Sequence, residues 1–423
     1  MRVGAGSIGA VRWGRLTLAT LAALVVLTGC GSKDALGTRI RGKTLTVYVS
    51  VPLRGASKVS GEAVSYGATL ALADVHGHIG GFRIDLKTLD DATAQRGGWD
   101  PGQTTINARI AVLDPTTIGY VGEMNSGASA VSIPPLNRAG IPQVSPTSSA
   151  VGLTTSDAGS FPGEPQKYYP TGVRTFARVV PNDTVQAIAQ VRVQQSMGCR
   201  NVYVLNDGEV DGVAAASSYE VAAQKAGLHV VGIQTFPRQA TSYVSLASGV
   251  AQTRPDCVLI SAETESGAVL LTEQLAAAMP DVKLFGSAGL AESSYFDPAQ
   301  GGIPDSISQR VILTAPLLAP QDYPESARAF VASYERRYGA IEPDSIFGYE
   351  SMSLLLSAID RATDHGSKPA VRSQVRAAMF ATRDRRSVLG TYSIDANGDT
   401  TLRRYGVYTI ADGQLSFWET ITA

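Results

Sequence analysis

The segment TIGYVGEMNSGAS, residues 117–129, places a short apolar run directly before a series of small and hydroxyl-bearing residues. A short run of apolar and β-branched residues closed by glycine is typical of a buried strand. Asn125 and Ser126 follow the run, and both residue types are preferred where a helix begins. A buried strand that leads into a helix is the repeating unit of a parallel sheet with crossover helices, so this segment favours an α/β fold.

The same alternation continues on both sides of this segment. The chain has 423 residues, of which 44% are hydrophobic and 17% are charged, which is enough to bury a large core in two domains. The first predicted unit has strands over 45–49, 84–89, 117–121 and 141–144 and helices over 62–75, 103–113 and 126–139. The second has strands over 202–205, 230–233, 257–260 and 283–285 and helices over 185–197, 213–226, 243–253 and 267–279. The C-terminal third adds helices over 327–338, 349–362 and 371–380 and a hairpin whose turn is Asn397-Gly398.

The N-terminus has the features of a targeting segment. Basic residues precede an apolar stretch over 16–27 that is too short to span a bilayer comfortably. The stretch ends in Leu27-Thr-Gly-Cys30, which resembles a bacterial lipobox, in which the cysteine is lipidated and becomes the new N-terminus. We therefore expect a lipoprotein signal peptide over 1–29, a lipid on Cys30, a tether over 30–43 and a location outside the cytoplasmic membrane. An ordinary cleaved signal peptide with an incidental cysteine is the alternative.

Two further cysteines remain for a compartment that permits disulfides. Cys199 lies just before one predicted strand and Cys257 opens another. If those strands are parallel neighbours, the two thiols lie at the same edge of the sheet and can bridge. Two buried free thiols are the alternative.

Several classes of function lack their signatures in the sequence. There are four histidines and no Gly-x-Ser-x-Gly elbow, Walker A sequence or Gly-x-Gly-x-x-Gly motif, which argues against a hydrolase and against nucleotide chemistry. His76 and His78 lie close together but without a third ligand at metal spacing. The balance of 36 basic against 37 acidic side chains provides no overall field for nucleic acid. We therefore expect no enzyme activity, no cofactor, no metal and no nucleic-acid partner.

Hydroxyl-bearing loops are the remaining candidates for a binding site. Ser126 follows one predicted strand and the segment SPTSS, residues 145–149, follows the next. In an open α/β sheet the ligand lies beyond the carboxyl ends of the strands, where helix N-termini present free N–H groups to an anion. A carboxylate fits this position, although each residue alone is also an ordinary helix cap. In the second unit Glu265 precedes a helix and can accept hydrogen bonds from an ammonium group, or can serve only the helix N-terminus.

The order and spacing of short motifs over nearly all of the chain after residue 43 carry a family resemblance. These motifs are Val51-Pro-Leu-Arg-Gly55, Ile79-Gly-Gly81, Asp90-Asp91, Gly122–Ser126, Ala139-Gly-Ile-Pro142, Ser145-Pro146, Arg178-Val-Val-Pro-Asn-Asp183, Phe347-Gly-Tyr349 and Asp395-Ala-Asn-Gly398. In this order they resemble the substrate-binding proteins of branched-chain amino-acid ABC transporters, the Leu/Ile/Val-binding type of periplasmic binding protein.

The resemblance implies a fold and a division into lobes. The implied fold is α/β, with two Rossmann-like lobes built on parallel sheets and joined by a three-segment hinge, the type I periplasmic binding protein fold. The first lobe is then expected over 44–180 and 290–388, and the second over 181–289 and 389–423.

The resemblance also implies a clamp for an α-amino acid with one half on each lobe. Carried over by position, the carboxylate is held by Ser126, by the backbone and side chain near Thr147, and by Ser149, with Asn125 beside them. The glutamate that binds the ammonium group in the family corresponds to Glu265.

Three departures from the family leave the ligand open. The chain has Ser60-Gly61 where many relatives have an aromatic residue before glycine, and Val210-Asp211-Gly212 where they have Tyr-Gly. Asn125 stands where some relatives have a disulfide cysteine. Leucine, isoleucine and valine are therefore no better supported than another amino acid, a small amide or an aromatic acid.

We therefore predict a lipid-anchored extracytoplasmic binding protein of an ABC importer. It is expected to act as a monomer, to capture an amino acid or a similar small zwitterion between two closing lobes, and to deliver it to a membrane permease and its ATPase. A sensory module that reports the ligand to a separate signalling partner is the alternative, and a secreted hydrolase is the third reading.

Overall fold

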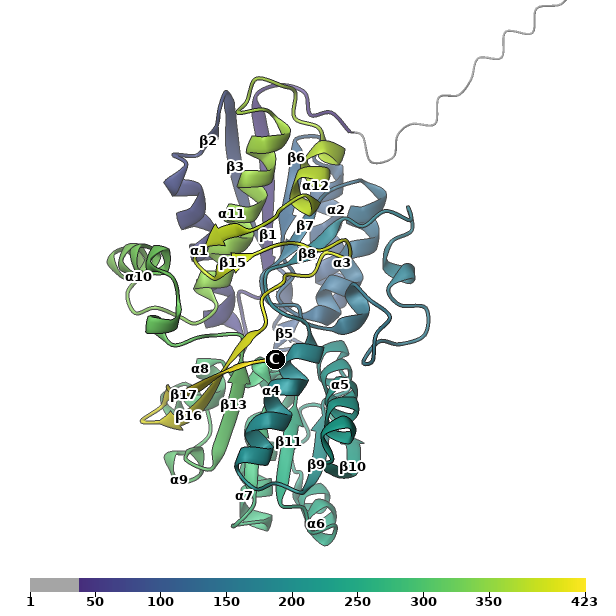
Figure 1. Ribbon diagram of the computed structural model, residues 1–423, viewed down its shortest axis with the longest axis vertical. Helices are drawn as coiled ribbons and strands as arrows, with labels where there is room; N and C mark the ends of the chain where they lie inside the picture. Colours follow the sequence, from purple (N-terminus) through teal and green to yellow (C-terminus); the bar gives the residue numbers. More distant parts are fainter. Residues whose placement is uncertain (1–37) are drawn as a thin grey trace, which may run out of the picture. The chain divides into compact units, whose positions relative to one another are not determined.

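The computed structural model describes residues 38–423, which contain two large β-sheets with helices on both faces of each, and two small two-stranded sheets (Figure 1). The predicted signal peptide, the lipidated Cys30 and most of the predicted tether lie outside the described residues. Within 38–423, no helix has both the length and the apolar composition needed to cross a bilayer.

The first sheet has six strands in the order β2-β3-β1-β6-β7-β8. They are β1 (Thr44–Val51), β2 (His78–Ile79), β3 (Phe82–Asp90), β6 (Thr117–Val121), β7 (Gln143–Ser145) and β8 (Phe176–Arg178). All neighbours pair in parallel except β2, which is antiparallel to β3. Residues 45–51 of β1 are all buried, as expected for a strand covered by helices on both faces.

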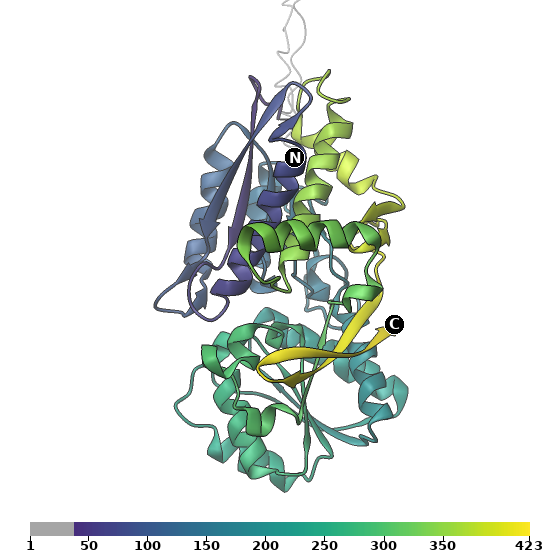
Figure 2. The ribbon, with the colours of Figure 1, turned by 90° about the vertical axis from the view of Figure 1, so that its left-hand side faces the viewer.

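Helices from both ends of the chain cover this first sheet. They are α1 (Lys58–Asp74), α2 (Pro101–Leu113), α3 (Ser126–Arg138), α10 (Glu325–Tyr338), α11 (Ser345–Ala362) and α12 (Arg372–Phe380). Alternate side chains of β1 enter different clusters, because Val47 and Val49 pack with α1 and α11, whereas Tyr48 packs with α2 and α3. Figure 2 shows the C-terminal helices, in green, beside α1, in purple. The first lobe is thus completed by residues from the last quarter of the chain.

The second sheet has seven strands in the order β10-β9-β11-β12-β13-β16-β17. They are β9 (Asn201–Asn206), β10 (His229–Thr235), β11 (Cys257–Ser261), β12 (Lys283–Gly286), β13 (Val311–Ala315), β16 (Arg404–Ala411) and β17 (Gln414–Thr422). The first five of these are parallel, and β16 and β17 add two antiparallel strands at one edge. The predicted α/β fold with two parallel-sheet lobes is confirmed. The predicted hairpin is wrong in its pairing: residues 404–410 lie in β16, which pairs with β13 and β17, and the Asn397-Gly398 turn is closed by an isolated bridge between Ile394 and Thr400. Turn residues mark a reversal of the chain but do not fix which strands pair.

Two pairs of helices cover the second sheet. They are α4 (Asp183–Ser196) with α5 (Val210–Ala226), and α6 (Val244–Gln252) with α7 (Ala268–Ala278). In β11, Leu259 packs with the first pair, whereas Val258 and Ile260 pack with the second pair. Gly227 ends α5 in the left-handed conformation with φ of 78°, which glycine adopts without strain.

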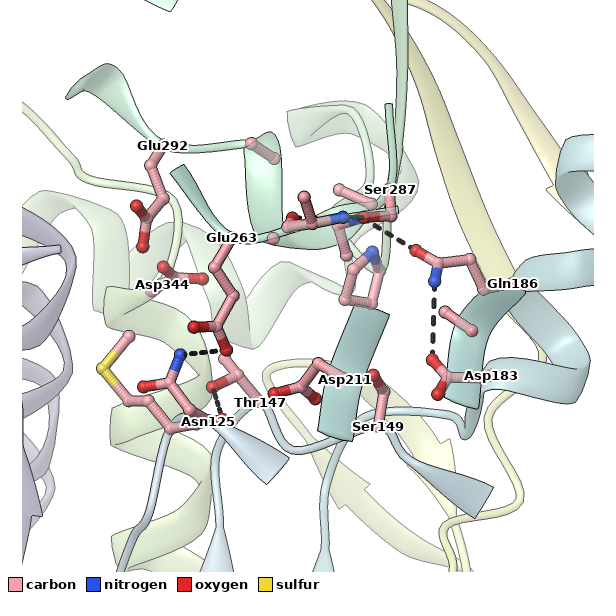
Figure 3. A pocket seen from close by; sticks show the side chains of 18 of the residues that line it. Asn125, Thr147, Ser149, Asp183, Gln186, Asp211, Glu263, Ser287, Glu292 and Asp344 are labelled. Atoms are coloured by element: carbon pink, nitrogen blue, oxygen red, sulfur yellow. Dashed lines mark hydrogen bonds between the residues drawn. The ribbon is translucent and has the colours of Figure 1, made fainter. Parts of the chain in front are cut away.

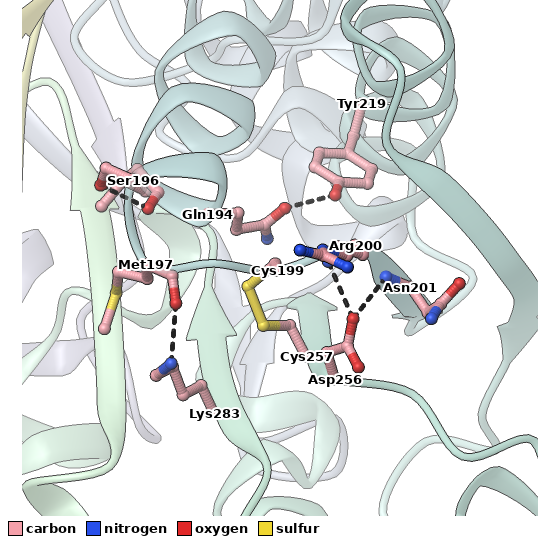
Figure 4. The surroundings of a disulfide bond; sticks show 11 residues. Gln194, Ser196, Met197, Cys199, Arg200, Asn201, Tyr219, Asp256, Cys257 and Lys283 are labelled. Atoms are coloured by element: carbon pink, nitrogen blue, oxygen red, sulfur yellow. Dashed lines mark hydrogen bonds between the residues drawn. A yellow bond between two sulfur atoms is a disulfide. The ribbon is translucent and has the colours of Figure 1, made fainter.

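Cys199 and Cys257 are joined by a disulfide with a Cα–Cα distance of 5.9 Å (Figure 4). The bond links the segment just before β9 to the first residue of β11, and these two strands are parallel neighbours. It closes a loop of the chain that contains α5, β10 and α6.

Short elements complete the described part of the chain. They are β4 (Ala92–Thr93), β5 (Gly98–Trp99), β14 (Arg385–Ser387), β15 (Gly390–Tyr392), α8 (Ser293–Phe296), α9 (Asp305–Ser308) and the 3-10 helices η1 (Val151–Leu153), η2 (Gln166–Tyr168), η3 (Thr264–Ser266), η4 (Ala288–Leu290), η5 (Pro298–Gln300) and η6 (Pro320–Asp322).

The chain passes between the two lobes at three places: between β8 and α4, between β13 and α10, and between β15 and β16. Two of these places differ from the predicted boundaries. Strand β13 lies within the predicted first-lobe segment 290–388 but pairs with β12 and β16 of the second sheet. Gly398, predicted for the second lobe, accepts a hydrogen bond from the N–H of Arg178 on β8. Apolar periodicity identifies a strand but not its partner, so it cannot assign a strand near a crossing to a lobe.

Candidate functional site

A cavity between the two lobes is lined by residues that follow strands of both sheets. Its volume is about 90 Å³, which admits a small molecule and not a macromolecule. This is the crevice at the carboxyl ends of the strands where open α/β sheets bind ligands. The polar residues that line it and are labelled in Figure 3 are Asn125, Thr147, Ser149, Asp183, Gln186, Asp211, Glu263, Ser287, Glu292 and Asp344.

Three of the predicted site residues line this cavity, namely Asn125, Thr147 and Ser149. The Thr147 hydroxyl donates to the carbonyl of Met124 over 2.9 Å, which joins the loops after β6 and β7. The Asn125 side-chain N–H donates to Glu263 Oε1 of the second lobe over 2.7 Å, and its Oδ1 has no partner within residues 38–423. These residues therefore form the first-lobe wall of the cavity.

Ser126 is fully buried and is not among the described residues that line the cavity. Its Oγ accepts hydrogen bonds from the backbone N–H groups of Ser149, over 3.1 Å, and Ala150, over 3.0 Å. Its own backbone N–H, at the start of α3, donates to Oδ2 of Asp211 over 2.7 Å. Ser126 thus fixes the loop after β7, and a carboxylate from the second lobe already occupies the N-terminus of α3.

Glu263 and Glu265 are both buried but have different surroundings. Glu263 lines the cavity and accepts from Asn125 and, over 3.2 Å, from the Trp99 indole N–H. Glu265 lies in the 3-10 turn η3, where it accepts from the Ser57 hydroxyl over 3.1 Å and is not among the cavity-lining residues. The structure therefore places Glu263 at the position on the cavity that the sequence assigned to Glu265.

Five acidic residues of the cavity were not predicted as site residues: Asp183, Asp211, Glu263, Glu292 and Asp344. Asp211 lies in the departure from Tyr-Gly at Val210-Asp211-Gly212, which left the pocket wall open. Asp183 begins α4, directly after a crossing between the lobes, and Asp344 precedes α11 after another. Asp183 is the last residue of the family motif Arg178-Val-Val-Pro-Asn-Asp183, but the resemblance implied no ligand contact for it, and Asp344 lies in none of the family motifs.

Burial governs the titration of these acids. Desolvation raises the pKa of Asp183 to about 7 and that of Asp344 to about 6. The pKa of Glu263 is raised by burial and by the nearby charges of Glu265 and Asp211, and that of Glu292 is raised by burial and by Glu265. The cavity therefore disfavours the charged form of its own carboxyl groups unless a positive charge is present.

No basic side chain is among the described residues that line the cavity. Arg96 and Arg238 are both engaged with Glu209, and Arg96 does so across the lobe boundary with an N–O distance of 2.6 Å. The acids also do not converge as metal ligands, since no group of three or more His, Cys, Asp or Glu in residues 38–423 could hold a metal ion.

A family model described as Periplasmic binding protein matches residues 44–414 of the chain. The chain belongs to the periplasmic binding protein family. No sequence among curated proteins matches it.

Solved structures agree with the fold of this periplasmic binding protein. The leucine binding protein LivK from Thermotoga maritima is 20% identical with a TM-score of 0.76, and the match covers 89% of this chain and 99% of LivK. LivJ from Streptococcus pneumoniae, a branched-chain amino acid transporter substrate binding protein in complex with isoleucine, is 19% identical with a TM-score of 0.73, over 90% and 100% of the two chains. A solute binding protein of an ABC transporter from R. palustris, in complex with 4-hydroxybenzoate, is 16% identical with a TM-score of 0.72, over 90% and 97%.

At these identities the likeness establishes a shared fold. The family resemblance predicted from the sequence is confirmed, and the cavity of this periplasmic binding protein lies in the crevice between its two lobes.

Proposed function

We propose that this periplasmic binding protein is the solute-binding component of an ABC importer, holding one small organic molecule between its lobes and presenting it to a membrane permease with its ATPase. The single observation that carries the proposal is the cavity between two lobes that the chain crosses at three places. In this arrangement binding energy closes the lobes, and the permease distinguishes the closed form from the open one.

Hydrogen bonds between the lobes support a closing mechanism. Asn125 and the backbone N–H of Ser126 in the first lobe donate to Glu263 and Asp211 in the second. Both acceptors are carboxylates, which water solvates well when the cleft is open. These hydrogen bonds alone therefore stabilise the closed form only a little. A ligand that contacts both lobes supplies the difference in affinity that closure requires.

The predicted N-terminal lipid on Cys30 completes the proposal, because it holds the protein at the outer face of the membrane beside its permease. In this proposal the anchored monomer delivers its ligand directly to the permease and its ATPase. Thr147 and Ser149 on one lobe and Glu263 on the other supply the polar contacts that an amino acid or a similar small molecule needs.

A thermal-shift screen of small solutes against the purified protein tests the proposal, because a ligand that binds only the native state raises the melting temperature. We expect one solute class to raise it, and uptake of that solute by cells to be lost when the gene is deleted. Unchanged uptake in the deletion strain, with a signalling response lost instead, contradicts the importer and supports the sensory alternative. Chemical conversion of the solute by the purified protein contradicts a binding role.

A further inference from the structure

The acids of the cavity are spread along it rather than gathered at one point. Five lining residues are acidic, namely Asp183, Asp211, Glu263, Glu292 and Asp344, and none of the described lining residues is Lys, Arg or His. In Figure 3 Glu292 and Asp344 lie on one side, Asp183 on the other, and Glu263 between them. A ligand carboxylate would meet carboxyl groups along the whole cavity and no basic side chain among the described lining residues, so burying its charge there is costly.

The position that suits a ligand carboxylate is already filled. The N-terminus of α3 is where free N–H groups and the helix dipole favour an anion. There the Ser126 N–H donates to Asp211 Oδ2 over 2.7 Å, and the Ser126 Oγ accepts from the next loop. The chain therefore provides its own carboxylate at the place where an α-amino acid would put one.

Asp183 provides an independent indication of a ligand group. Its side chain lines the cavity although the residue is 1% exposed, and its Oδ2 has no hydrogen-bond partner within residues 38–423. Its Oδ1 receives a long bond of 3.4 Å from the Gln186 side chain, and the nearby Ser149 side chain partly offsets the rise that burial causes in its pKa. A buried carboxylate oxygen without a donor is costly, and an ammonium group can satisfy it.

Asp344 offers a second acceptor at the other side of the cavity. It is the N-cap residue of α11, but its side chain makes no capping hydrogen bond, and its carboxylate lies at the cavity near the side chain of Ser60. Glu292 beside it receives only the Ser57 hydroxyl, over 3.1 Å. The walls between the two sides include the apolar side chains of Met124, Leu317 and Phe347, which suit an aliphatic chain.

We propose that the ligand of this cavity is an aliphatic diamine or polyamine without a free carboxylate, with one ammonium group on Asp183 and another on Asp344 and Glu292. This inference rests on the proposed function and names the ligand class of the same site. Each ammonium group forms charge-assisted hydrogen bonds with these carboxylates. It also supplies the positive charge that none of the described lining residues provides. The alkyl chain between them lies against the apolar walls.

Calorimetry on the purified full chain tests the inference with putrescine, cadaverine and spermidine as amines, butylamine as a monoamine, and leucine, isoleucine and 4-hydroxybenzoate as carboxylic acids. We expect the diamines to bind, butylamine to bind at least about tenfold more weakly, and the acids not to bind at the same concentrations. Asp183→Asn and Asp344→Asn should each weaken putrescine binding by roughly 30-fold or more, toward the affinity of butylamine.

Glu220→Gln is the matched control, because Glu220 is an exposed carboxylate on α5 away from the cavity lining, and it should leave putrescine binding within about twofold. Circular dichroism and the melting temperature of each variant establish that it is folded. Tighter binding of leucine or 4-hydroxybenzoate than of putrescine overturns the inference and still supports the proposed function. Binding of none of these compounds also overturns the inference, and the wider solute screen then decides the proposed function separately.

Discussion

Arg178 and Asp183 lie close together in the sequence, at the same crossing between the lobes, but their charges have different surroundings. Arg178 is fully buried and pairs with Asp399 over 2.7 Å. It also donates to the carbonyls of Ser148 and Ala150, over 3.1 and 2.8 Å. Asp183 is equally buried, but within the described residues it forms no salt bridge, feels the charge of Arg178 only at longer range, and leaves one oxygen unsatisfied.

The difference indicates which buried charges are structural. Burying an ion is costly unless an opposite charge and hydrogen bonds compensate it. The chain provides that compensation at Arg178 and again at Glu350, which accepts from Arg385 and from the Tyr392 hydroxyl, each over 2.6 Å. In the cavity Glu263 and Asp211 accept hydrogen bonds, but none of the described lining residues carries a positive charge. The opposite charge is therefore expected to come from the ligand.

The largest effect is expected from Arg178→Met, which leaves Asp399 buried without its counter-charge. Breaking one side of a buried ion pair typically costs about 3–5 kcal/mol in the free energy of unfolding. Urea denaturation measures this change, with Arg109→Met as the control because Arg109 is exposed on α2. If the free energy of unfolding falls by less than about 1 kcal/mol, Asp399 does not need the charge of Arg178. The proposed difference between a compensated charge at Arg178 and an uncompensated one at Asp183 would then be wrong.

Asp183→Asn should act in the opposite direction and only at higher pH. The raised pKa of Asp183, about 7, means that the native state keeps the proton that the unfolded state loses near pH 4. The stability that this protonated carboxyl contributes is present below about pH 4 and is lost as the pH rises through about 7. Asn stays neutral, so the variant should equal the wild type near pH 4 and exceed it by about 2–4 kcal/mol near pH 8.

Thermal and urea unfolding of both proteins across this pH range, without ligand, measure the effect. Glu220→Gln is again the control, and its stability should run parallel to the wild type. A constant difference between Asp183→Asn and the wild type at every pH would mean that Asp183 titrates in the same way in the folded and unfolded states.

The fold could be predicted because its signals are local. Apolar runs such as residues 117–121 identify buried strands, and the alternation with amphipathic segments predicts two α/β lobes. Strand β13 was not among the predicted strands, and its lobe could not be predicted either, since strand pairing is a contact between distant residues. The C-terminal β16–β17 hairpin joins the second sheet for the same reason.

The candidate site could be predicted in part. Asn125, Thr147 and Ser149 follow strands, and topology brings the carboxyl ends of parallel strands to one edge. The choice between Glu263 and Glu265 depends on the 3-10 turn η3, which directs Glu265 toward Ser57 and away from the cavity lining. Asp183 and Asp344 reach the cavity through the crossing segments, whose geometry depends on how both lobes pack.

A smaller effect is expected from Asp211→Ala, which removes the carboxylate that the chain places on the N-terminus of α3. The backbone N–H of Ser126 then loses its acceptor, which costs roughly 1–3 kcal/mol unless another acceptor replaces it. A ligand carboxylate can take that place, so leucine should gain affinity relative to its binding by the wild type. Calorimetry with leucine measures this gain. Unchanged leucine affinity in a folded Asp211→Ala variant would mean that Asp211 does not occupy a binding position for a ligand carboxylate.

The smallest effect is expected from Glu265→Gln. Glu265 Oε2 accepts from the Ser57 hydroxyl, Oε1 has no partner within residues 38–423, and neither oxygen lines the cavity. Gln keeps the shape and one acceptor, so ligand affinity should change by no more than about threefold. In Glu263→Gln the N–H₂ group faces one of the two donors, Asn125 or Trp99, and closure should weaken by about 1–3 kcal/mol. Calorimetry on the two variants with the solute found in the screen compares them directly. A larger loss of ligand affinity in Glu265→Gln than in Glu263→Gln would show that Glu265 contacts the ligand, as the family resemblance implies. Glu265 would then have to join the cavity lining when the ligand binds.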